Sequence, residues 1–426
     1  MLCLLMLPNL ILLVVIGADP IAVSQPPPEL HVRARSYTDA GFQVGQAFSD
    51  RIHSFWQDYR QTSDVQAVFK YITDTNGKAS FQALANAIQQ HMPNQWDELK
   101  GLAQGSGLSF RTILIINLLP ELVDLVDQSR HHNNDNHGTT ISRSDDDNSP
   151  INQACTDLLL HDVGLAHNED NEPAIGRYAY ILHVSIIDNE DVNNGDHYQT
   201  KQDNIKQHPW FTAYTYPGTL PGCAWAFNSH GLVQTTNALF PEDIGTTNIG
   251  RYIVARSLLT ASSIDQVHTQ MLLHTQEASA FSVNFVELST GNLTNFEVAS
   301  GHPVNRYDVD HYYNHVNSFK RIHPIRSRPN QSSEHRQATL DSLGTPQSMG
   351  DMRSILGDTS DPAFPIYRNA TGPDRCDTLC TLIVDLQQKQ IQLFMKNPAS
   401  SSFQRQWNFP QLSQEKESQA QRYSEE

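Results

Sequence analysis

The chain has 426 residues and a formal net charge of −17, from 29 Lys and Arg against 46 Asp and Glu. This acidic balance argues against a surface built to bind nucleic-acid phosphates, which needs clustered cations, and is compatible with a cationic small-molecule substrate. Hydrophobic residues make up 38% of the chain, enough for one large core or two ordinary ones.

Residues 2–16 form an apolar run that is interrupted only by Pro8 and Asn9. The run is too short for a stable membrane span, and its length suits the core of a signal peptide. A positively charged start is missing, so we expect residues 1–24 to be either a signal peptide or an apolar extension. Residues 19–37 contain three consecutive prolines and are predicted to be a tether.

The five cysteines are too few and too scattered to form a disulfide scaffold. Cys376 and Cys380 are four positions apart, but no second Cys or His pair at zinc-binding spacing accompanies them. A His-rich run at 131–137 is better explained as part of a solvated loop. The sequence also lacks a phosphate-binding loop, so it predicts neither a metal nor a cofactor.

The predicted elements change from helices to strands along the chain. Apolar spacings of three and four predict helices near 38–59, 81–91, 96–102, 110–125, 249–259, 263–274, 336–343 and 348–356. Strands are predicted at 156–163, 178–187, 211–216, 223–227, 232–237, 280–288, 293–298, 312–319, 378–386 and 391–395. This order, with helices first, then strands, two helices and strands again, favours an α+β layered domain over a parallel α/β sheet.

A polar segment separates the helical part from the strands. Residues 129–152 contain only Ile141 and Ile151 as large apolar residues, so burial cannot offset the entropy of ordering them. We therefore predict a mainly helical segment over 25–154 that ends in a disordered linker at 129–152. The strand-rich segment 155–426 follows, and its last part, 399–426, is predicted to be a polar tail.

Cys155 begins an apolar strand directly after that linker. A cysteine in such a strand is usually an inert buried residue. The linker before it, the polar Thr156 and Asp157 after it, and the cluster at 167–170 one turn later favour a nucleophile. A cut between Ala154 and Cys155 would place a thiol and a free amine on one residue, which is an established way to activate a nucleophile.

The other candidate groups have two interpretations each on sequence alone. Glu169 and Asp170 are better explained, on sequence alone, as turn residues before Pro173 than as site residues. Asn317 is either a structural amide in an aromatic-rich strand or a donor to a developing oxyanion. Arg375 precedes a strand and is either a surface arginine or part of a site.

Taken together, these residues resemble the acyltransferase family of N-terminal-nucleophile hydrolases typified by the fungal isopenicillin N acyltransferase. The likeness extends from about Tyr37 to Met395, and its strength lies in the order and spacing of several motifs. The matching positions are Cys155-Thr156, Asn168-x-Asp170, Phe227-Asn228-Ser229-x-Gly231, Asn237, His315-x-Asn317, Phe364-x-Ile366-x-Arg368 and Arg375. The resemblance implies an αββα sandwich and self-cleavage before the cysteine.

The resemblance also implies roles for these residues. Cys155 is the expected nucleophile, its freed amine the base, and Asn317 the oxyanion donor. Asp170 and Arg375 are expected to form an ion pair that orients the amine; Arg375 is the better match to the family's arginine, and Arg368 is the second. The implied substrate pocket contains Asn168, Asn237, His315 and Arg368. One departure lies at the junction, where relatives usually carry glycine and this chain has Ala154; the added methyl group restricts φ and predicts slower self-cleavage.

Within the family, the Cys-Thr-Asp start and the Ala-His-Asn-Glu-Asp ending resemble insect hydrolases of β-alanyl amines. The implied reactions are hydrolysis of N-β-alanyl-dopamine to dopamine and β-alanine, and of carcinine to histamine and β-alanine. Two associated chains, 1–154 and 155–426, and a cytoplasmic location are implied, although residues 2–16 keep the secretory pathway open. The alternatives are an acyltransferase or amidohydrolase of the same fold for another N-acyl amine, and a secreted binding protein without catalysis.

Overall fold

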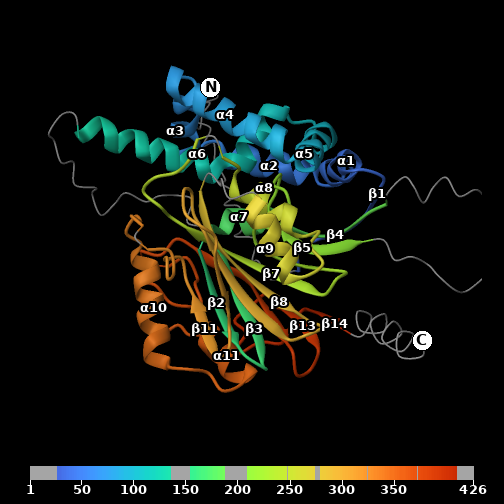
Figure 1. The fold of residues 1–426 in the computed structure, drawn as a ribbon, viewed down its shortest axis with the longest axis vertical. Helices are drawn as coiled ribbons and strands as arrows, with labels where there is room; N and C mark the ends of the chain where they lie inside the picture. The colour runs from blue at the N-terminus through green and yellow to red at the C-terminus, as the bar shows by residue number, and fades with distance from the viewer. Residues whose placement is uncertain are drawn as a thin grey trace, which may run out of the picture.

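Two β-sheets face each other in the computed structural model, which describes residues 26–135, 154–187, 209–246, 248–273, 279–323, 325–371 and 373–409 (Figure 1). The first sheet has the order β1 (Glu29–Ala34), β4 (Tyr180–Ile186), β5 (Trp210–Thr215), β6 (Trp225–Asn228), β7 (Leu232–Leu239), β8 (Ala280–Glu287), β9 (Asn292–Val298), β10 (Asn305–Asp308). The second has the order β11 (Tyr312–His315), β2 (Ala154–Leu160), β3 (Gly164–Asn171), β12 (Asp377–Asp385), β13 (Gln390–Phe394), β14 (Arg405–Asn408).

Helices cover the outer face of each sheet. Against the first sheet lie α8 (Arg251–Leu258) and α9 (Ile264–Leu273), where Gln234 of β7 donates to the Ala255 carbonyl of α8. Against the second lie α10 (Gln331–Leu343) and α11 (Met349–Leu356), where Leu158 of β2 shares an apolar cluster with Leu340 and Leu356. The described residues therefore form an α+β fold with the layers α, β, β, α, as expected.

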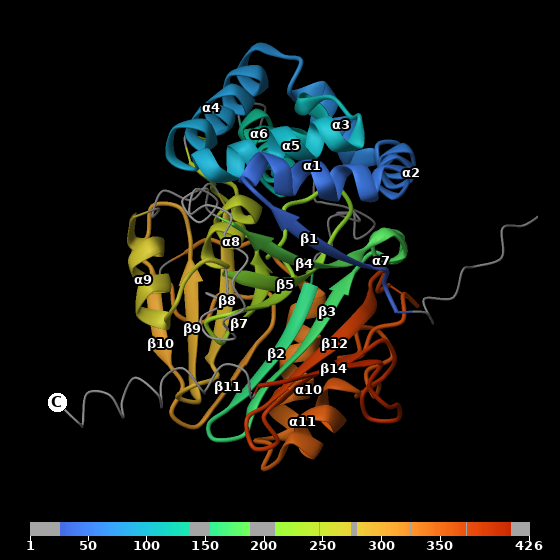
Figure 2. The same cartoon turned by 90° about the vertical axis from the view of Figure 1, so that its right-hand side faces the viewer.

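A helical layer caps one end of this sandwich, as Figures 1 and 2 show from two sides. Its helices are α1 (Tyr37–Ala47), α2 (Ser49–Tyr59), α3 (Ser63–Tyr71), α4 (Thr75–His91), α5 (Pro93–Ser106) and α6 (Phe110–Asp135). Glycines allow α1 and α5 to touch backbone to backbone. A Cβ added at Gly41 would lie 2.0 Å from the Glu98 carbonyl oxygen, and one at Gly101 would lie 1.9 Å from that of Thr38.

Several expectations are corrected. Residues 29–34 of the expected tether form β1, which pairs in parallel with β4, so the N-terminal segment contributes a strand to the first sheet. Helix α6 runs to Asp135 and enters the expected linker; residues 136–153 lie outside the described part. Strand β14 lies in the expected tail. The helices α3 and α7 (Pro173–Tyr178) and the strand β10 were not predicted.

The expected signal or extension at 1–24 lies outside the described residues, as does the tail from 410. Among the helices that the structure describes, none combines the length and the apolar character that crossing a bilayer requires.

Candidate active site

Cys155 lies on β2 with its side chain between the two sheets. The β2–β3 register pairs Cys155 with Glu169 and Asp157 with His167, and the alternation of a strand puts all four side chains on one face. That face meets the first sheet, because the Thr235 hydroxyl of β7 donates to Asp157 Oδ1 at 2.7 Å.

A group of polar residues lies between the sheets, beside apolar residues such as Leu159 and Leu165 on the same face of β2 and β3. Each of these inward side chains is fully buried, which is costly unless its polar atoms have partners. The inward set comprises Cys155, Asp157, His167, Glu169, Thr235, Asn237, Ser282, Asn284, Asn295, Glu297 and His315. A layer that sacrifices hydrophobic burial in this way is typical of a functional site.

A chain of hydrogen bonds leads to the thiol. Asp157 Oδ1 lies 2.9 Å from His167 Nδ1, and His167 Nε2 lies 3.1 Å from Glu169 Oε2. The other carboxylate oxygen, Glu169 Oε1, accepts from the Tyr216 hydroxyl and from the Cys155 thiol, whose Sγ is 4.0 Å away. Burial alone would lower the pKa of His167, but Asp157 and Glu169 raise it to about 10, so the ring is an imidazolium that donates to both carboxylates.

The thiol is protonated in the uncut chain. Burial raises the pKa of Cys155 well above its ordinary value, and the carboxylates of Glu169, Asp170 and Asp157 raise it further. The side chain has no exposed surface. Because only the thiolate is an effective nucleophile, a base has to take this proton before any attack.

Asn317, which follows β11, contacts the backbone of Cys155. Its Oδ1 accepts from the Cys155 amide nitrogen at 3.0 Å, and its Nδ2 donates to the Ala238 carbonyl at 3.0 Å. An amide nitrogen carries two hydrogens, so one donor of Nδ2 remains for another acceptor. The structure thus brings together two of the residues that the sequence singled out.

Arg336, a fully buried residue of α10, was not predicted from the sequence. Its Nη1 donates to the Cys155 carbonyl at 2.7 Å and to Thr156 Oγ1 at 2.9 Å, and its Nη2 donates to Asn317 Oδ1 at 2.9 Å. Burial, then the nearby Arg368, lower the pKa of Arg336 to about 10. These bonds fix the Asn317 amide with its oxygen toward the Cys155 nitrogen. No local motif marks Arg336, since its contacts depend on how α10 docks.

Asp170 lies on the opposite face of β3 from the thiol. Its Oδ1 accepts from Thr378 Oγ1 at 2.6 Å, and its Oδ2 is 3.9 Å from Arg368 Nη1. Burial raises the pKa of Asp170 to about 7, although Arg368 and Arg336 lower it. The expected ion pair with Arg375 is wrong: Arg375 is exposed, and the buried arginine beside Asp170 is Arg368, whose Nε donates to Asp374 at 2.7 Å.

The remaining pocket candidates differ in how fully their polar atoms are satisfied. Asn168 donates to the carbonyls of Leu356 and Ile366 and accepts from Thr381, so it joins β3 to α11. Asn237 Nδ2 is buried and has no hydrogen-bond partner among the described residues, and the same holds for His315 Nδ1. Their roles toward a substrate stay predictions.

Two described groups have ligand atoms close enough for a metal, but neither fits one well. Cys155, His167 and Glu169 form the first; a metal needs a neutral imidazole, whereas His167 is charged and both of its nitrogens face carboxylates. Glu29, His31 and His183 form the second. There the two rings stack at 4.3 Å with planes 13° apart, so their in-plane lone pairs do not converge.

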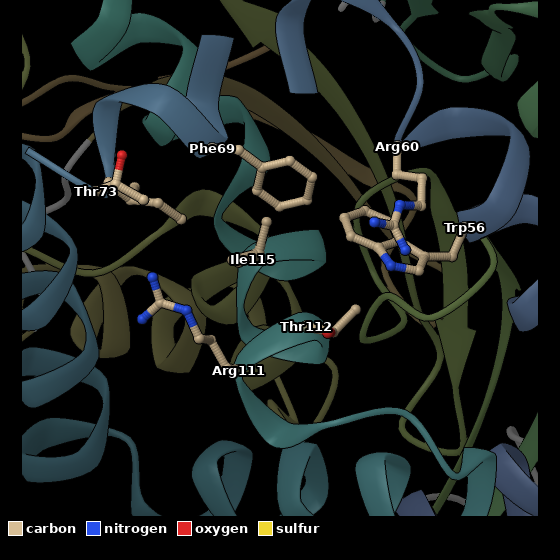
Figure 3. A pocket seen from close by; sticks show the side chains of 8 residues that line it. Trp56, Arg60, Phe69, Thr73, Arg111, Thr112 and Ile115 are labelled. Carbon is tan, nitrogen blue, oxygen red and sulfur yellow. The ribbon is translucent and has the colours of Figure 1, made fainter. Parts of the chain in front are cut away.

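The cavity drawn in Figure 3 belongs to the helical layer and has a volume of about 310 Å³. Trp56 of α2, Phe69 of α3 and Ile115 of α6 line it, with Arg60 and Arg111 at its sides. Its lining residues include neither Cys155 nor Glu169 nor Asn317, so it is not the site of the thiol.

The comparisons with known proteins decide the family. Residues 161–400, more than half of the chain, match the family model of acyl-coenzyme A:6-aminopenicillanic acid acyl-transferase. The chain belongs to this family. The matched segment contains Asp170, Asn317 and Arg368 and begins just after Cys155. The family expected from the sequence is therefore confirmed.

The relatives of this family member include an enzyme of nearly the same length. The chain is 25% identical over 391 residues to the beta-alanyl-dopamine/carcinine hydrolase of Drosophila melanogaster, covering 88% of this chain and 94% of the relative. Among solved structures, it is similar to a mutant of the conjugated bile acid hydrolase from Clostridium perfringens (TM-score 0.31, 13% identity, 60% of this chain and 97% of that one). It is also similar to the penicillin V acylase from Agrobacterium tumefaciens (TM-score 0.29, 9% identity, 56% and 82%).

Proposed function

We propose that this protein is a self-cleaving amide hydrolase that uses Cys155 as its nucleophile and acts on β-alanyl amines such as N-β-alanyl-dopamine and carcinine. The observation that carries the proposal is the surrounding of Cys155, whose thiol donates to Glu169 while its amide nitrogen donates to Asn317. The substrate class comes from the similarity to the Drosophila hydrolase over most of both chains.

Self-cleavage is the first reaction. The Cys155 sulfur attacks the Ala154 carbonyl carbon, the carbon–nitrogen bond breaks, and the acyl group moves to sulfur while the nitrogen gains the thiol proton. Water then hydrolyses this thioester, which gives a carboxylate on Ala154 and a free thiol and amine on Cys155. The products are the chains 1–154 and 155–426.

Substrate hydrolysis follows on the mature residue. The α-amine of Cys155 titrates near about 7.7–8.0, close to working pH, so it accepts the thiol proton as the general base. The thiolate attacks the β-alanyl carbonyl, and the free donor of Asn317 Nδ2 stabilises the oxyanion. The amine leaves with the proton from the Cys155 ammonium, and water hydrolyses the β-alanyl thioester.

Contacts across the proposed cut support the association of the two chains. Strand β1 pairs with β4 of the other chain over six residues. Glu98 of α5 forms a buried ion pair with Arg256 of α8 at 2.9 Å, and Glu121 of α6 accepts from the Arg251 backbone nitrogen at 2.9 Å. Separating the chains would expose an apolar core and leave buried charges unpaired, which is costly.

A matched pair of amides tests the substrate class. Carcinine and N-acetylhistamine share the histamine part, but only carcinine carries the β-alanyl ammonium group. We expect the purified protein to release histamine from carcinine much faster, and the Cys155→Ala variant to release none. Faster cleavage of a long-chain N-acyl amine than of carcinine would favour the other N-acyl amine substrates. An uncut chain without hydrolysis of either would favour a binding protein.

A further inference from the structure

The base proposed for substrate hydrolysis does not exist before self-cleavage. In the uncut chain the nitrogen of Cys155 is a peptide nitrogen, and it donates its hydrogen to Asn317 Oδ1. A peptide nitrogen cannot accept the thiol proton. The first reaction of the protein therefore needs a different proton acceptor within reach of the Cys155 thiol.

We propose that Glu169 is the catalytic base of self-cleavage, and that Asp157, His167 and Tyr216 position it. This inference rests on the proposed function and adds a residue to its first step. Glu169 and Cys155 are register partners on β3 and β2, and both side chains point between the sheets. The thiol donates to Glu169 Oε1 across 4.0 Å, the contact from which the proton is transferred.

The neighbours of Glu169 hold its carboxylate beside the thiol. The imidazolium of His167 bonds Oε2 at 3.1 Å and is itself held by Asp157 at 2.9 Å, so one carboxylate oxygen is anchored and the other faces the thiol. The Tyr216 hydroxyl also donates to Oε1. This arrangement differs from that of Asp170, which faces Arg368 and Thr378 on the other side of the strand.

The electrostatics of the site also suit proton transfer. Burial raises the pKa of Glu169, although His167 and Tyr216 lower it, so its carboxylate is a stronger base than an exposed one. Other titratable side chains surround the Glu169–Cys155 pair and influence the proton affinities there. They are Asp157 of β2, His167 and Asp170 of β3, Tyr214 of β5, Tyr216 and Cys223 after β5, Arg336 of α10 and Cys380 of β12.

The proton returns to the chain within the same step. Glu169 takes the hydrogen from sulfur as the sulfur–carbon bond to Ala154 forms. As the carbon–nitrogen bond breaks, the protonated carboxyl returns a hydrogen to the Cys155 nitrogen, and Glu169 is again a carboxylate. The free amine produced in this way is the base for all later turnovers.

Two substitutions separate a base from a structural residue. Glu169→Gln keeps the size and the hydrogen-bond acceptor but cannot take a proton, whereas Glu169→Asp keeps the carboxylate and withdraws it by one methylene. The full-length chains are made by cell-free translation, and cleavage at 154/155 is followed over time on denaturing gels. We expect Glu169→Gln to be slower than the natural chain by about a hundredfold or more, and slower than Glu169→Asp. A purely structural role predicts the opposite order.

The outcomes distinguish this inference from the proposed function. If the natural chain stays uncut, self-cleavage itself is refuted. If the natural chain is cut, and Glu169→Gln is cut at the same rate or faster than Glu169→Asp, only the role of Glu169 is refuted. Should Glu169→Gln not fold, Tyr216→Phe decides: loss of a hydrogen bond that lowers the pKa of Glu169 should move the acidic limb of the cleavage rate to higher pH, and an unmoved limb overturns the inference.

Discussion

Two parts of the molecule bury carboxylates, and their partners differ. At the boundary of the helical layer, Glu98 faces Arg256 and Asp124 faces Arg328, so each carboxylate meets a permanently charged guanidinium. Between the sheets, Glu169 instead meets an imidazole, a phenol and a thiol. Burial raises the pKa of Glu98, Asp124 and Glu169 alike. The guanidinium partners stabilise the contact between the layers but do not exchange protons near neutral pH. The partners of Glu169, in contrast, include a thiol that can transfer its proton to the carboxylate.

The nucleophile gives the sharpest test of this difference. Cys155→Ala removes the sulfur but little volume, so the fold should survive while self-cleavage and hydrolysis are both lost. A denaturing gel should show one band at 47.9 kDa. The Cys155→Ala variant therefore gives the zero rate to which the slower variants of Glu169 are compared. Cleavage of this variant at the same junction would assign the reaction to another residue.

The helical boundary should respond in stability and not in chemistry. Glu98→Gln leaves the fully buried Arg256 guanidinium without its counter-charge. We expect the free energy of unfolding to fall by about 3–5 kcal/mol, as measured by urea denaturation. The rate of self-cleavage in the folded variant should stay within a few-fold of the natural rate. A large loss of cleavage rate with unchanged stability would contradict the assignment of stability to the helical boundary and of catalysis to the residues between the sheets.

Asn317 tests the oxyanion role. Asn317→Ala removes the amide that binds the Cys155 nitrogen and the Ala238 carbonyl. We expect kcat to fall by on the order of a hundredfold or more, since one preorganised donor contributes that much to acyl transfer. Steady-state kinetics on carcinine check this, with thermal unfolding as the control; an unchanged kcat would make Asn317 structural.

The pH dependence of stability follows from His167. Its pKa is raised to about 10 from 6.5, so the folded state binds this proton more tightly than the unfolded state. The contribution is complete below pH 6.5 and is lost as pH rises to about 10, with a slope of at most about 1.4 kcal/mol per pH unit. Asp170, whose pKa is raised to about 7, contributes a loss in the same direction between pH 4 and 7. His167→Gln should flatten the dependence of the free energy of unfolding on pH above pH 7. An unchanged dependence would contradict a protonated His167 in the folded protein.

The smallest effect is expected at Arg375. This side chain is exposed, so Arg375→Ala should change the free energy of unfolding by no more than about 0.5 kcal/mol. Arg368→Ala, in contrast, leaves the buried carboxylates of Asp170 and Asp374 unpaired and should destabilise the fold by several kcal/mol. Equal effects of the two substitutions on urea denaturation would contradict the assignment of Arg368, in place of Arg375, as the partner of Asp170.

Local pattern was enough to predict the α+β class, the strand of Cys155 and the hairpin that returns to it. In that hairpin, a tight turn at 161–163 fixes the register and thereby sets Glu169 opposite Cys155. Glu169 and Asp170 were interpreted together from the sequence, although neighbours in a strand point to opposite faces. Applied to this hairpin, that alternation would have separated the residue beside the thiol from the residue on the far side.

Other parts of the site could not be predicted, because they depend on long-range docking. Arg336 reaches Cys155 across 181 positions of the chain, and the choice between Arg368 and Arg375 depends on how the segment before β12 turns back toward β3. Strand β1 follows three prolines, and the hydrogen bonds that make it a strand come from its parallel partner β4, which lies far away in the sequence. Such contacts have no periodic signal in the sequence.

The central claim is that the protein cuts itself before Cys155 and then works from the new N-terminus. Intact mass spectrometry of the purified natural chain, followed by sequencing of both N-termini, tests it directly. We expect one chain that begins at Cys155 and a partner that ends at Ala154. A single uncut chain that still hydrolyses carcinine would contradict it.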